Sequence, residues 1–559
     1  MTLDQSTVDN VAAPLDTLLV DAAFGPLRRW LPDASTARLA VRLARQPVGT
    51  GRRLATLAGE LGRVTAGRST LTPSPRDRRF VDPGWSNNPV LRRVAQAYLA
   101  TAGAVNGIVD GAGLDWRDQH RVRFLAENLL EALAPSNVPL LNPASAKAAV
   151  DTGGMNFVRG ARNLARDLAQ PPRVPQMVDP SAFTVGENLA ATPGAVVVRT
   201  EVLELIQYAP QTPTVREVPL LLVPPTINKF YAIDLAPGRS WVEHLVRGGQ
   251  QVFTLSWRNP DARHAEWGLD TYVQAVLDAI DAVARICRSD QVMLAGVCSG
   301  GILASLAAGH LAGTERLAGL GLAVTVLDHR RAGLPAALSD RRLAAAATYL
   351  SRRRGYLDGR RLGELFAWLR PGDLIWNYWV NNYLLGQAPP AFDVLYWNAD
   401  TTRMTAGLHA DFVALAIHNG LIEPGSTTVL GRPVDLSTVT VDSYVVAGVA
   451  DHITPWQNCY RSRAMLGGDS RFVLSTSGHI AALVNPPDNP KATYQVNSEP
   501  IADPDEWLRG ARTERGSWWP DFADWLGQRC GQPRRAPRKL GARGYPPVVA
   551  APGTYVYDR

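Results

Sequence analysis

The residues best suited to chemistry are a cysteine set among glycines and, later in the chain, an aspartate and a histidine. Cys298 lies in the segment GVCSGG, residues 296–301, after an apolar run and before a stretch of small residues with helical character. This is the glycine–x–nucleophile–x–glycine elbow, whose glycines avoid clashes at a tight strand-to-helix turn. The helix N-terminus favours the thiolate form of a cysteine. The pattern predicts nucleophilic catalysis by Cys298, with the N–H of Ser299 in an oxyanion hole.

An elbow nucleophile needs an acid and a histidine that follow it in that order. Asp451 ends the apolar run 442–451, and His479 comes directly after the run 471–476. The carboxyl ends of parallel strands meet at one edge of a sheet, so both residues are expected beside the elbow. We therefore predict a catalytic triad of Cys298, Asp451 and His479.

Two alternatives stay open at these positions. His452 adjoins Asp451 and is a second candidate base, although successive side chains on a strand point in opposite directions. Asp328 ends the apolar run 322–328 and is a second candidate acid. The remaining histidines lack this context and are interpreted as surface or packing residues: His120, His244, His264, His310, His329, His409 and His418.

A second oxyanion donor is expected from the loop at residues 224–230, PPTINKF, which follows the apolar run 219–223. In elbow enzymes a loop at this place supplies a backbone N–H, here from Thr226 or Ile227, and we predict Thr226. The alternative is an ordinary loop stiffened by proline. No phosphate-binding glycine loop, dinucleotide motif or metal-ligand spacing is present in the sequence, so neither a metal nor a cofactor is expected.

A sheet must position these side chains, and seven short apolar runs predict its strands: residues 195–198, 219–225, 251–257, 291–297, 322–328, 442–451 and 471–476. Helical patterns separate several of them. The clearest helix has one apolar face, formed by Tyr272, Val276, Ile280, Val283 and Cys287. Apolar strands that alternate with helices indicate a mostly parallel sheet covered on both faces. With the elbow, this predicts an α/β-hydrolase fold.

Composition divides the chain into two predicted domains. Residues 1–180 are helix-rich and end in a proline-rich linker at 171–180, which predicts a helical N-terminal domain. Residues 181–559 form the predicted catalytic domain. Within it, the helical segment at about 329–433 is expected to be a cap insertion over the site, the alternative being a helical excursion packed on the sheet.

Charge and hydropathy limit the other function classes. The net charge is +7, with a basic cluster at residues 534–543, but no nucleic-acid motif accompanies it. We interpret the excess as solvated surface with some attraction for anionic substrates. Four widely spaced cysteines do not form a disulfide framework. The first thirty residues hold four aspartates and no signal-peptide pattern, and charges interrupt the most apolar stretch, so a cytoplasmic protein without a transmembrane segment is expected.

Several long motifs resemble polyhydroxyalkanoate synthases. They are the elbow GVCSGG, the acid segment GVADHITPW, the histidine segment SGHIAALVNPP, and the stretches LELIQYAP, PPTINKFYAIDLAP and SWRNPDARHAEWGLDTYV. The likeness extends from about Asp77 to the end of the sequence. Residues 377–403 and the final APGTYVYDR resemble the class II synthases, single-subunit enzymes that favour medium-chain 3-hydroxyacyl-CoA. Thr405 departs from the family pattern, in which proline is expected.

This resemblance implies an acyltransferase that polymerises (R)-3-hydroxyacyl-CoA into polyester and releases CoA. Cys298 would carry the acyl or polyester chain as a thioester, His479 would deprotonate its thiol, and Asp451 would help to activate the hydroxyl of the next unit. Trp397 and Asn398 are implied near the substrate, and we add His452 as a further candidate there. The resemblance further implies a homodimer at the surface of cytoplasmic polyester granules, beside other granule-associated proteins.

Two other functions compete with this prediction. A cysteine-dependent α/β-hydrolase, such as a thioesterase or a polyester depolymerase, would use the same triad, because hydrolysis differs from chain transfer in whether water or a hydroxyl attacks the acyl-enzyme. Serine is the commoner nucleophile for hydrolysis. The second is a structural granule protein with a relic triad, which the complete triad disfavours.

Overall fold

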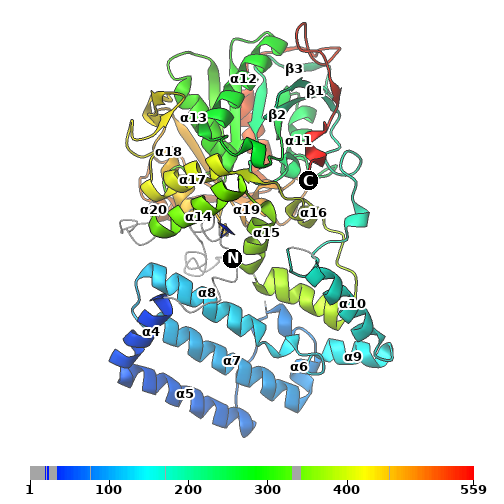
Figure 1. Cartoon of the computed structure of the whole chain (residues 1–559), viewed down its shortest axis with the longest axis vertical. Coiled ribbons are helices and arrows are strands. Elements are labelled where there is room, and N and C mark those ends of the chain that lie inside the picture. The colour runs from blue at the N-terminus through cyan, green and yellow to red at the C-terminus, as the bar shows by residue number, and fades with distance from the viewer. Residues whose placement is uncertain are drawn as a thin grey trace. The chain divides into compact units, whose positions relative to one another are not determined.

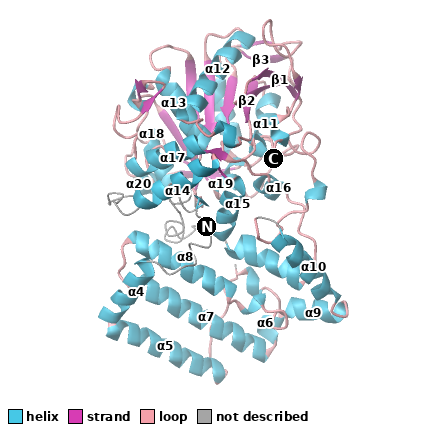
Figure 2. Ribbon diagram, in the orientation of Figure 1, coloured by secondary structure: helices cyan, strands magenta, loops and turns pink. Residues whose placement is uncertain are grey.

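The chain forms two compact units in the computed structural model (Figure 1). The structure describes residues 34–75, 77–169, 172–329, 341–369, 371–451 and 453–559, together with Leu19, Ala22 and Ala23. The sheet unit consists mainly of Pro180–Arg360 and Phe392–Arg559, and the helical unit of Phe24–Asp179 and Arg361–Ala391. Among the described residues, strands occur only in the sheet unit (Figure 2).

In the helical unit, capping residues in the sequence determine where some of the helices begin. Asn88 and Asn142 each cap the helix that follows, with proline at its first position. The helices are α4 Ala34–Arg45, α5 Pro47–Thr65, α6 Gly84–Asn87, α7 Pro89–Asp110, α8 Trp116–Ala132, α9 Pro143–Asp151 and α10 Met155–Ala169. Among the described residues, none of these or of the other helices is long and apolar enough to cross a membrane.

A later part of the chain packs with these helices. Two π-helical turns, Gly372–Trp376 and Trp379–Leu384, belong to the helical unit, where Asn156 donates to the carbonyl of Leu384 at 2.7 Å. The predicted cap at 329–433 includes this stretch; its described residues outside 361–391 lie in the sheet unit. The predicted division into two domains, with this cap, therefore stays a prediction. The compact units differ from it at residues 361–391, which were predicted in the catalytic domain and belong to the helical unit.

The sheet unit is organised around eleven strands in the order β15-β14-β13-β12-β7-β6-β4-β5-β2-β1-β17. From β13 to β5 all neighbours are parallel, and the pairs beyond them are antiparallel. The strands are β1 Gly194–Arg199, β2 Leu203–Tyr208, β4 Leu220–Val223, β5 Val252–Trp257, β6 Val292–Val297, β7 Leu317–Ala323, β12 Ser443–Gly448, β13 Ser470–Ser475, β14 Thr493–Val496, β15 Arg512–Arg515 and β17 Val549–Ala550. Parallel order is therefore confined to the centre of the sheet.

Three two-stranded ribbons and the remaining helices complete this unit. The ribbons are β3 Thr214–Arg216 with β16 Pro533–Arg535, β8 Tyr356–Leu357 with β9 Met404–Thr405, and β10 Thr428–Val429 with β11 Arg432–Pro433. The helices are α11 Trp241–Arg247, α12 Leu269–Cys287, α13 Ser299–His310, α14 Arg341–Arg354, α15 Gly359–Leu369, α16 Asp393–Ala399, α17 Ala406–His418, α18 Trp456–Arg463, α19 His479–Leu483, α20 Pro504–Arg509 and α21 Trp518–Gly527. α15 begins in the sheet unit and continues into the helical unit.

Helices α12 and α13 pack on each other, as do α11 and α21. The predicted apolar face of α12 is buried, which confirms that helix. Six of the seven predicted strands are present. The seventh, 322–328, is wrong in its extent, because β7 ends at Ala323. Val324 has a φ of +44°, and the hydroxyl of Thr325 bonds the carbonyl of Cys298, so the strand cannot continue. Asp328 therefore does not end a strand.

Candidate active site

The elbow holds Cys298 in a strained backbone conformation between β6 and α13. Its φ is +52° and its ψ −122°, in a region that a residue with a side chain rarely adopts and that costs about 1–3 kcal/mol. The surroundings impose this geometry. The N–H of Cys298 donates to the carbonyl of Ala323 at 2.9 Å, and its own carbonyl accepts from the Thr325 hydroxyl at 3.3 Å. The side chain therefore lies at the N-terminus of α13, beside the carboxyl edge of the parallel strands.

The elbow glycines are required because other atoms occupy the space of a side chain. A Cβ on Gly296 would lie 2.4 Å from the Cα of Gly301, and a Cβ on Gly301 would lie 2.0 Å from the hydroxyl of Thr325. A Cβ on Gly300 would lie 2.2 Å from the carbonyl oxygen of Val223. Because two of these obstacles are backbone atoms, they cannot move without moving β4 or α13.

Gly300→Ala is therefore expected to destabilise the protein by about 2–3 kcal/mol or to prevent its folding. Gly309→Ala, on the same helix, is the matched control. Its Cβ would have no neighbour closer than 3.6 Å, and alanine stabilises a helix interior by about 0.5–1 kcal/mol. Chemical denaturation of both variants measures the difference. Equal stability of the two would show that the tight approach of α13 to β4 is wrong.

His479 and Asp451 meet in a buried hydrogen-bonded pair. The Nδ1 of His479 lies 2.7 Å from the Oδ2 of Asp451, and both side chains are buried. The hydroxyl of Thr454 donates to the same oxygen at 2.6 Å, and the N–H groups of Ile453 and Thr454 donate to the other oxygen at 2.8 and 2.9 Å. These bonds hold the carboxylate in one orientation.

The electrostatics of this pair extend to the cysteine. Burial alone would lower the pKa of His479, but the charges of Asp451 and Cys298 and hydrogen bonds to both raise it to about 10. Burial also acts to raise the pKa of Asp451, yet the charge of His479 and its hydrogen bonds hold this pKa below its usual value. Since Nδ1 faces Asp451, Nε2 is the nitrogen left for Cys298. The site thus favours an imidazolium at neutral pH.

The structure thus brings Cys298, Asp451 and His479 together, and it places the alternatives elsewhere or leaves them open. The carboxylate of Asp328 accepts from the Nδ2 of Asn419 at 3.1 Å and lies 3.8 Å from the guanidinium of Arg461. His452, predicted as a possible base and substrate contact, lies outside the described residues. All four cysteines are free and buried: Cys287, Cys298, Cys459 and Cys530. Burial raises the pKa of the Cys459 thiol, which agrees with the absence of an activating neighbourhood in its sequence.

The predicted oxyanion donors differ in availability. Ser299 is the first residue of α13, so its N–H has no acceptor within the helix. The N–H of Thr226, in contrast, already donates to the side-chain oxygen of Ser299 at 3.0 Å. The next N–H in the loop, that of Ile227, has no acceptor among the described residues, and its carbonyl accepts from the N–H of Thr402 at 3.3 Å. The loop thus lies beside the elbow, as predicted, but Ile227 presents the free amide.

The other two predicted substrate contacts, Trp397 and Asn398, both lie on α16. Trp397 is buried, and its indole N–H donates to the carbonyl of Lys229 at 2.7 Å. Asn398 is half-buried on the same helix, α16. Sequence reasoning missed Thr454, which bonds Asp451 and lies 3.1 Å from the Nδ1 of His479. The spacing Asp-x-x-Thr after a strand could have revealed it, because an aspartate often accepts from N–H groups two and three residues later.

Comparison with known proteins agrees with this architecture. A family model described as "Poly-beta-hydroxybutyrate polymerase (PhaC) N-terminus" matches residues 76–245, and one described as "alpha/beta hydrolase fold" matches residues 219–486. Poly(3-hydroxyalkanoate) polymerase 2 of Ectopseudomonas oleovorans is 48% identical over 92% of each chain. The chain belongs to the poly(3-hydroxyalkanoate) polymerase family. Polymerase 1 of the same organism is 45% identical over 97% of each chain.

Membership in the polymerase family confirms three predictions from the sequence. The α/β-hydrolase fold is present, the protein is an acyltransferase of the polymerase type, and its resemblance to class II enzymes holds. The polymerase subunit PhaC of Cupriavidus necator is less similar, with 38% identity over 88% of this chain and 85% of its own. Among the described residues of this polymerase, no group of three or more His, Cys, Asp or Glu side chains could hold a metal ion.

Proposed function

We propose that this polymerase links (R)-3-hydroxyacyl units through a thioester on Cys298. The observation that carries the proposal is the buried pair of His479 and Asp451 beside the elbow: His479 bonds Asp451 through Nδ1, and the charge of Cys298 acts on the same imidazole. The Cys298 thiolate attacks the carbonyl carbon of the acyl-CoA thioester. When the intermediate collapses, the bond to the CoA sulfur breaks, and His479 donates its proton to the departing thiolate.

In elongation the same histidine acts as a base, whereas it acts as an acid in the release of CoA. With the chain on Cys298, His479 is neutral and accepts the proton of the 3-hydroxyl of an incoming acyl-CoA. The resulting oxygen nucleophile attacks the thioester carbon, an ester forms, and the Cys298 thiolate leaves. Transfer of the lengthened chain from its CoA back to Cys298 then releases CoA. Asp451 supports this step because its charge raises the basicity of the imidazole.

The negative oxygen formed in each attack needs two N–H donors. We assign these to Ser299 and Ile227, in place of the Thr226 donor predicted from the sequence, because the N–H of Thr226 already donates to the Ser299 hydroxyl. Such a donor pair contributes several kcal/mol only when it lies about 2.7–3.1 Å from the developing oxyanion. The Ser299 side chain fixes the spacing between the loop and the elbow.

The class II resemblance leads us to propose medium-chain 3-hydroxyacyl-CoA as the preferred substrate. With 3-hydroxyoctanoyl-CoA we expect a higher rate of CoA release than with 3-hydroxybutyryl-CoA, by about tenfold or more, since a single well-packed methylene already contributes about tenfold to specificity. Both rates are measured side by side, and the insoluble product is weighed. The reverse preference would mean that departures such as Thr405 change the acyl pocket. Release of free hydroxy acid without polymer would instead support a cysteine-dependent hydrolase.

We further propose that the protein acts as a homodimer on polyester granules in the cytoplasm. One structural feature supports contact with a hydrophobic surface: the helical unit carries most of the large apolar side chains that are exposed in the described part of the chain. They are Val41, Val48, Leu54, Val81, Val90, Leu129, Leu133, Val138, Leu140, Val150, Met155, Val158 and Leu168. Sedimentation with isolated granules measures this association directly.

A further inference from the structure

The oxyanion loop, residues 224–230, is held on one side by α16 and the segment that follows it. The indole N–H of Trp397 bonds the carbonyl of Lys229 at 2.7 Å, and the N–H of Thr402 bonds the carbonyl of Ile227 at 3.3 Å. The hydroxyl of Thr402 also donates to the carbonyl of Thr226 at 3.3 Å. These bonds go to the backbone of the loop, so they restrain its amide groups.

On its other side the loop is tied to the segment 553–559 by one buried side chain. The ammonium of Lys229 donates to the carbonyl of Asp558 at 2.5 Å and to that of Tyr555 at 3.2 Å. Lys229 is only 2% exposed, and burial lowers its pKa below the ordinary lysine value. In the described part of the chain no carboxylate lies within ion-pair distance of this ammonium. A lysine so placed is costly to bury, and the two carbonyls compensate this cost together with the charges of Asp400 and Asp558.

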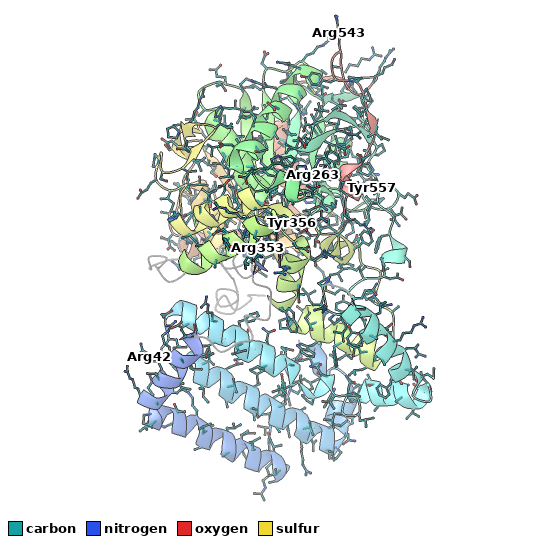
Figure 3. The ribbon with its side chains drawn as sticks, in the orientation of Figure 1. Arg42, Arg263, Arg353, Tyr356, Arg543 and Tyr557 are labelled. Atoms are coloured by element: carbon teal, nitrogen blue, oxygen red, sulfur yellow. The ribbon has the colours of Figure 1, made fainter. Side chains whose placement is uncertain are left out.

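The segment 553–559 is itself fixed, so it can serve as an anchor. The buried Glu204 accepts from the N–H of Tyr555 at 3.0 Å, and the guanidinium of Arg258 lies 4.3 Å from the Tyr555 ring and bonds its hydroxyl at 2.5 Å. Asn259 donates to the carbonyl of Asp558 at 3.2 Å. Glu204 lies on β2, and the other two follow β5, so the anchor is the sheet itself. Figure 3 labels Tyr557, which marks this segment on the surface of the sheet unit.

We propose that the segment 553–559 acts through Lys229 as a clamp that positions the oxyanion loop, which makes Lys229 a positioning residue for acyl transfer. This inference rests on the function proposed above. The loop amides lie one to three residues from Lys229, and the value of an oxyanion donor depends on its placement to within a few tenths of an ångström. Loss of the clamp therefore weakens stabilisation of the oxyanion without touching the Cys298–His479–Asp451 contacts.

The test compares Lys229→Met with Lys491→Met, an exposed lysine of the same unit. Methionine keeps the aliphatic length of lysine but donates no hydrogen bond. Two readouts separate positioning from folding: the first-turnover burst of CoA at saturating 3-hydroxyacyl-CoA, and the alkylation rate of Cys298 by iodoacetamide, which needs the thiolate but no oxyanion hole. For Lys229→Met we expect the acylation rate to fall about 10²-fold while alkylation is unchanged. Lys491→Met should match the wild type in both.

Two results would overturn the clamp. One is an unchanged acylation rate in Lys229→Met, and the other is a parallel loss of alkylation, which would reduce Lys229 to a folding role. If Lys229→Met does not fold, Tyr555→Phe replaces it, since it removes only the hydroxyl bonds to Arg258 and to the carbonyl of Thr200. A selective fall in its acylation rate supports the clamp, and no fall overturns it. Failure of the wild type to acylate Cys298 would instead contradict the proposed function.

Discussion

Cys298→Ala is expected to lower CoA release from 3-hydroxyacyl-CoA by about 10³-fold or more and to stop polymer formation. The substitution removes the sulfur that forms the thioester and leaves the elbow glycines and the neighbouring backbone bonds in place. Its fold should therefore stay intact, which circular dichroism and the thermal midpoint would show. Cys298→Ser should recover little activity, because a hydroxyl is far less acidic than a thiol and is therefore a weaker nucleophile here.

Cys459→Ala is the matched control for this experiment. Cys459 is also buried, and it lies near enough to the site for the charge of Cys298 to act on it, but burial raises the pKa of its thiol well above the ordinary value. It should retain most of the wild-type activity. If Cys298→Ala kept a tenth of the wild-type rate, or if Cys459→Ala lost activity while staying folded, the nucleophile would have to be reassigned.

The elbow and the order of the site residues could be predicted because both depend on local rules. A cysteine among glycines between an apolar run and a helix can form few structures other than this turn, and the side chains that follow parallel strands gather at one sheet edge. Asp451 and His479 could be placed together for this reason. Asp328 could not be excluded from the sequence, because the left-handed Val324 that ends β7 early lies in an unbroken apolar run.

The features that could not be predicted depend on contacts between residues that lie far apart in the sequence. Residues 372–384 are aromatic-rich and follow a sheet strand, which suits a cap, yet Asn156 and Asn163 bond their backbone within the helical unit. Lys229 is another example. Its partners are backbone carbonyls more than three hundred residues later, and a carbonyl gives no residue-type signal. The amide of Ile227, which has no acceptor within the described part of the chain, is a further example: it is left available because the hydroxyl of Ser299 accepts from the N–H of Thr226.

The second large effect is expected from substitutions of His479 and Asp451, which should block different steps of the reaction. His479→Ala removes the imidazolium beside the thiol, the one imidazole that the described residues place there. We expect radiolabelled acyl groups to stop accumulating on the protein, with a loss of about 10³-fold or more in the first-turnover rate. Alkylation of Cys298 by iodoacetamide at neutral pH should also slow, because less thiolate is present.

Asp451→Asn should leave the first acylation possible and stop elongation. The charge of Asp451 is the largest influence that raises the pKa of His479, so without it this pKa falls and the imidazole is a weaker base. A neutral imidazole can still accept the proton of a thiol. It is too weak a base for a hydroxyl, whose pKa is far higher. We expect a burst of about one equivalent of CoA, label held on Cys298 and almost no polymer.

Asp328→Asn is the control for this division of roles, since it removes the charge of the rival acid while keeping its size. It should support both acylation and polymer formation. Labelling lost in both His479→Ala and Asp451→Asn would mean that Asp451 acts only by orienting His479, as the acid does in a simple triad. Full polymerisation by Asp451→Asn, with loss in Asp328→Asn, would transfer the acid role to Asp328. Whether Asp451→Asn shows a burst of CoA, and whether it goes on to form polymer, thus decides if the carboxylate is needed for the thiol, for the hydroxyl, or for neither.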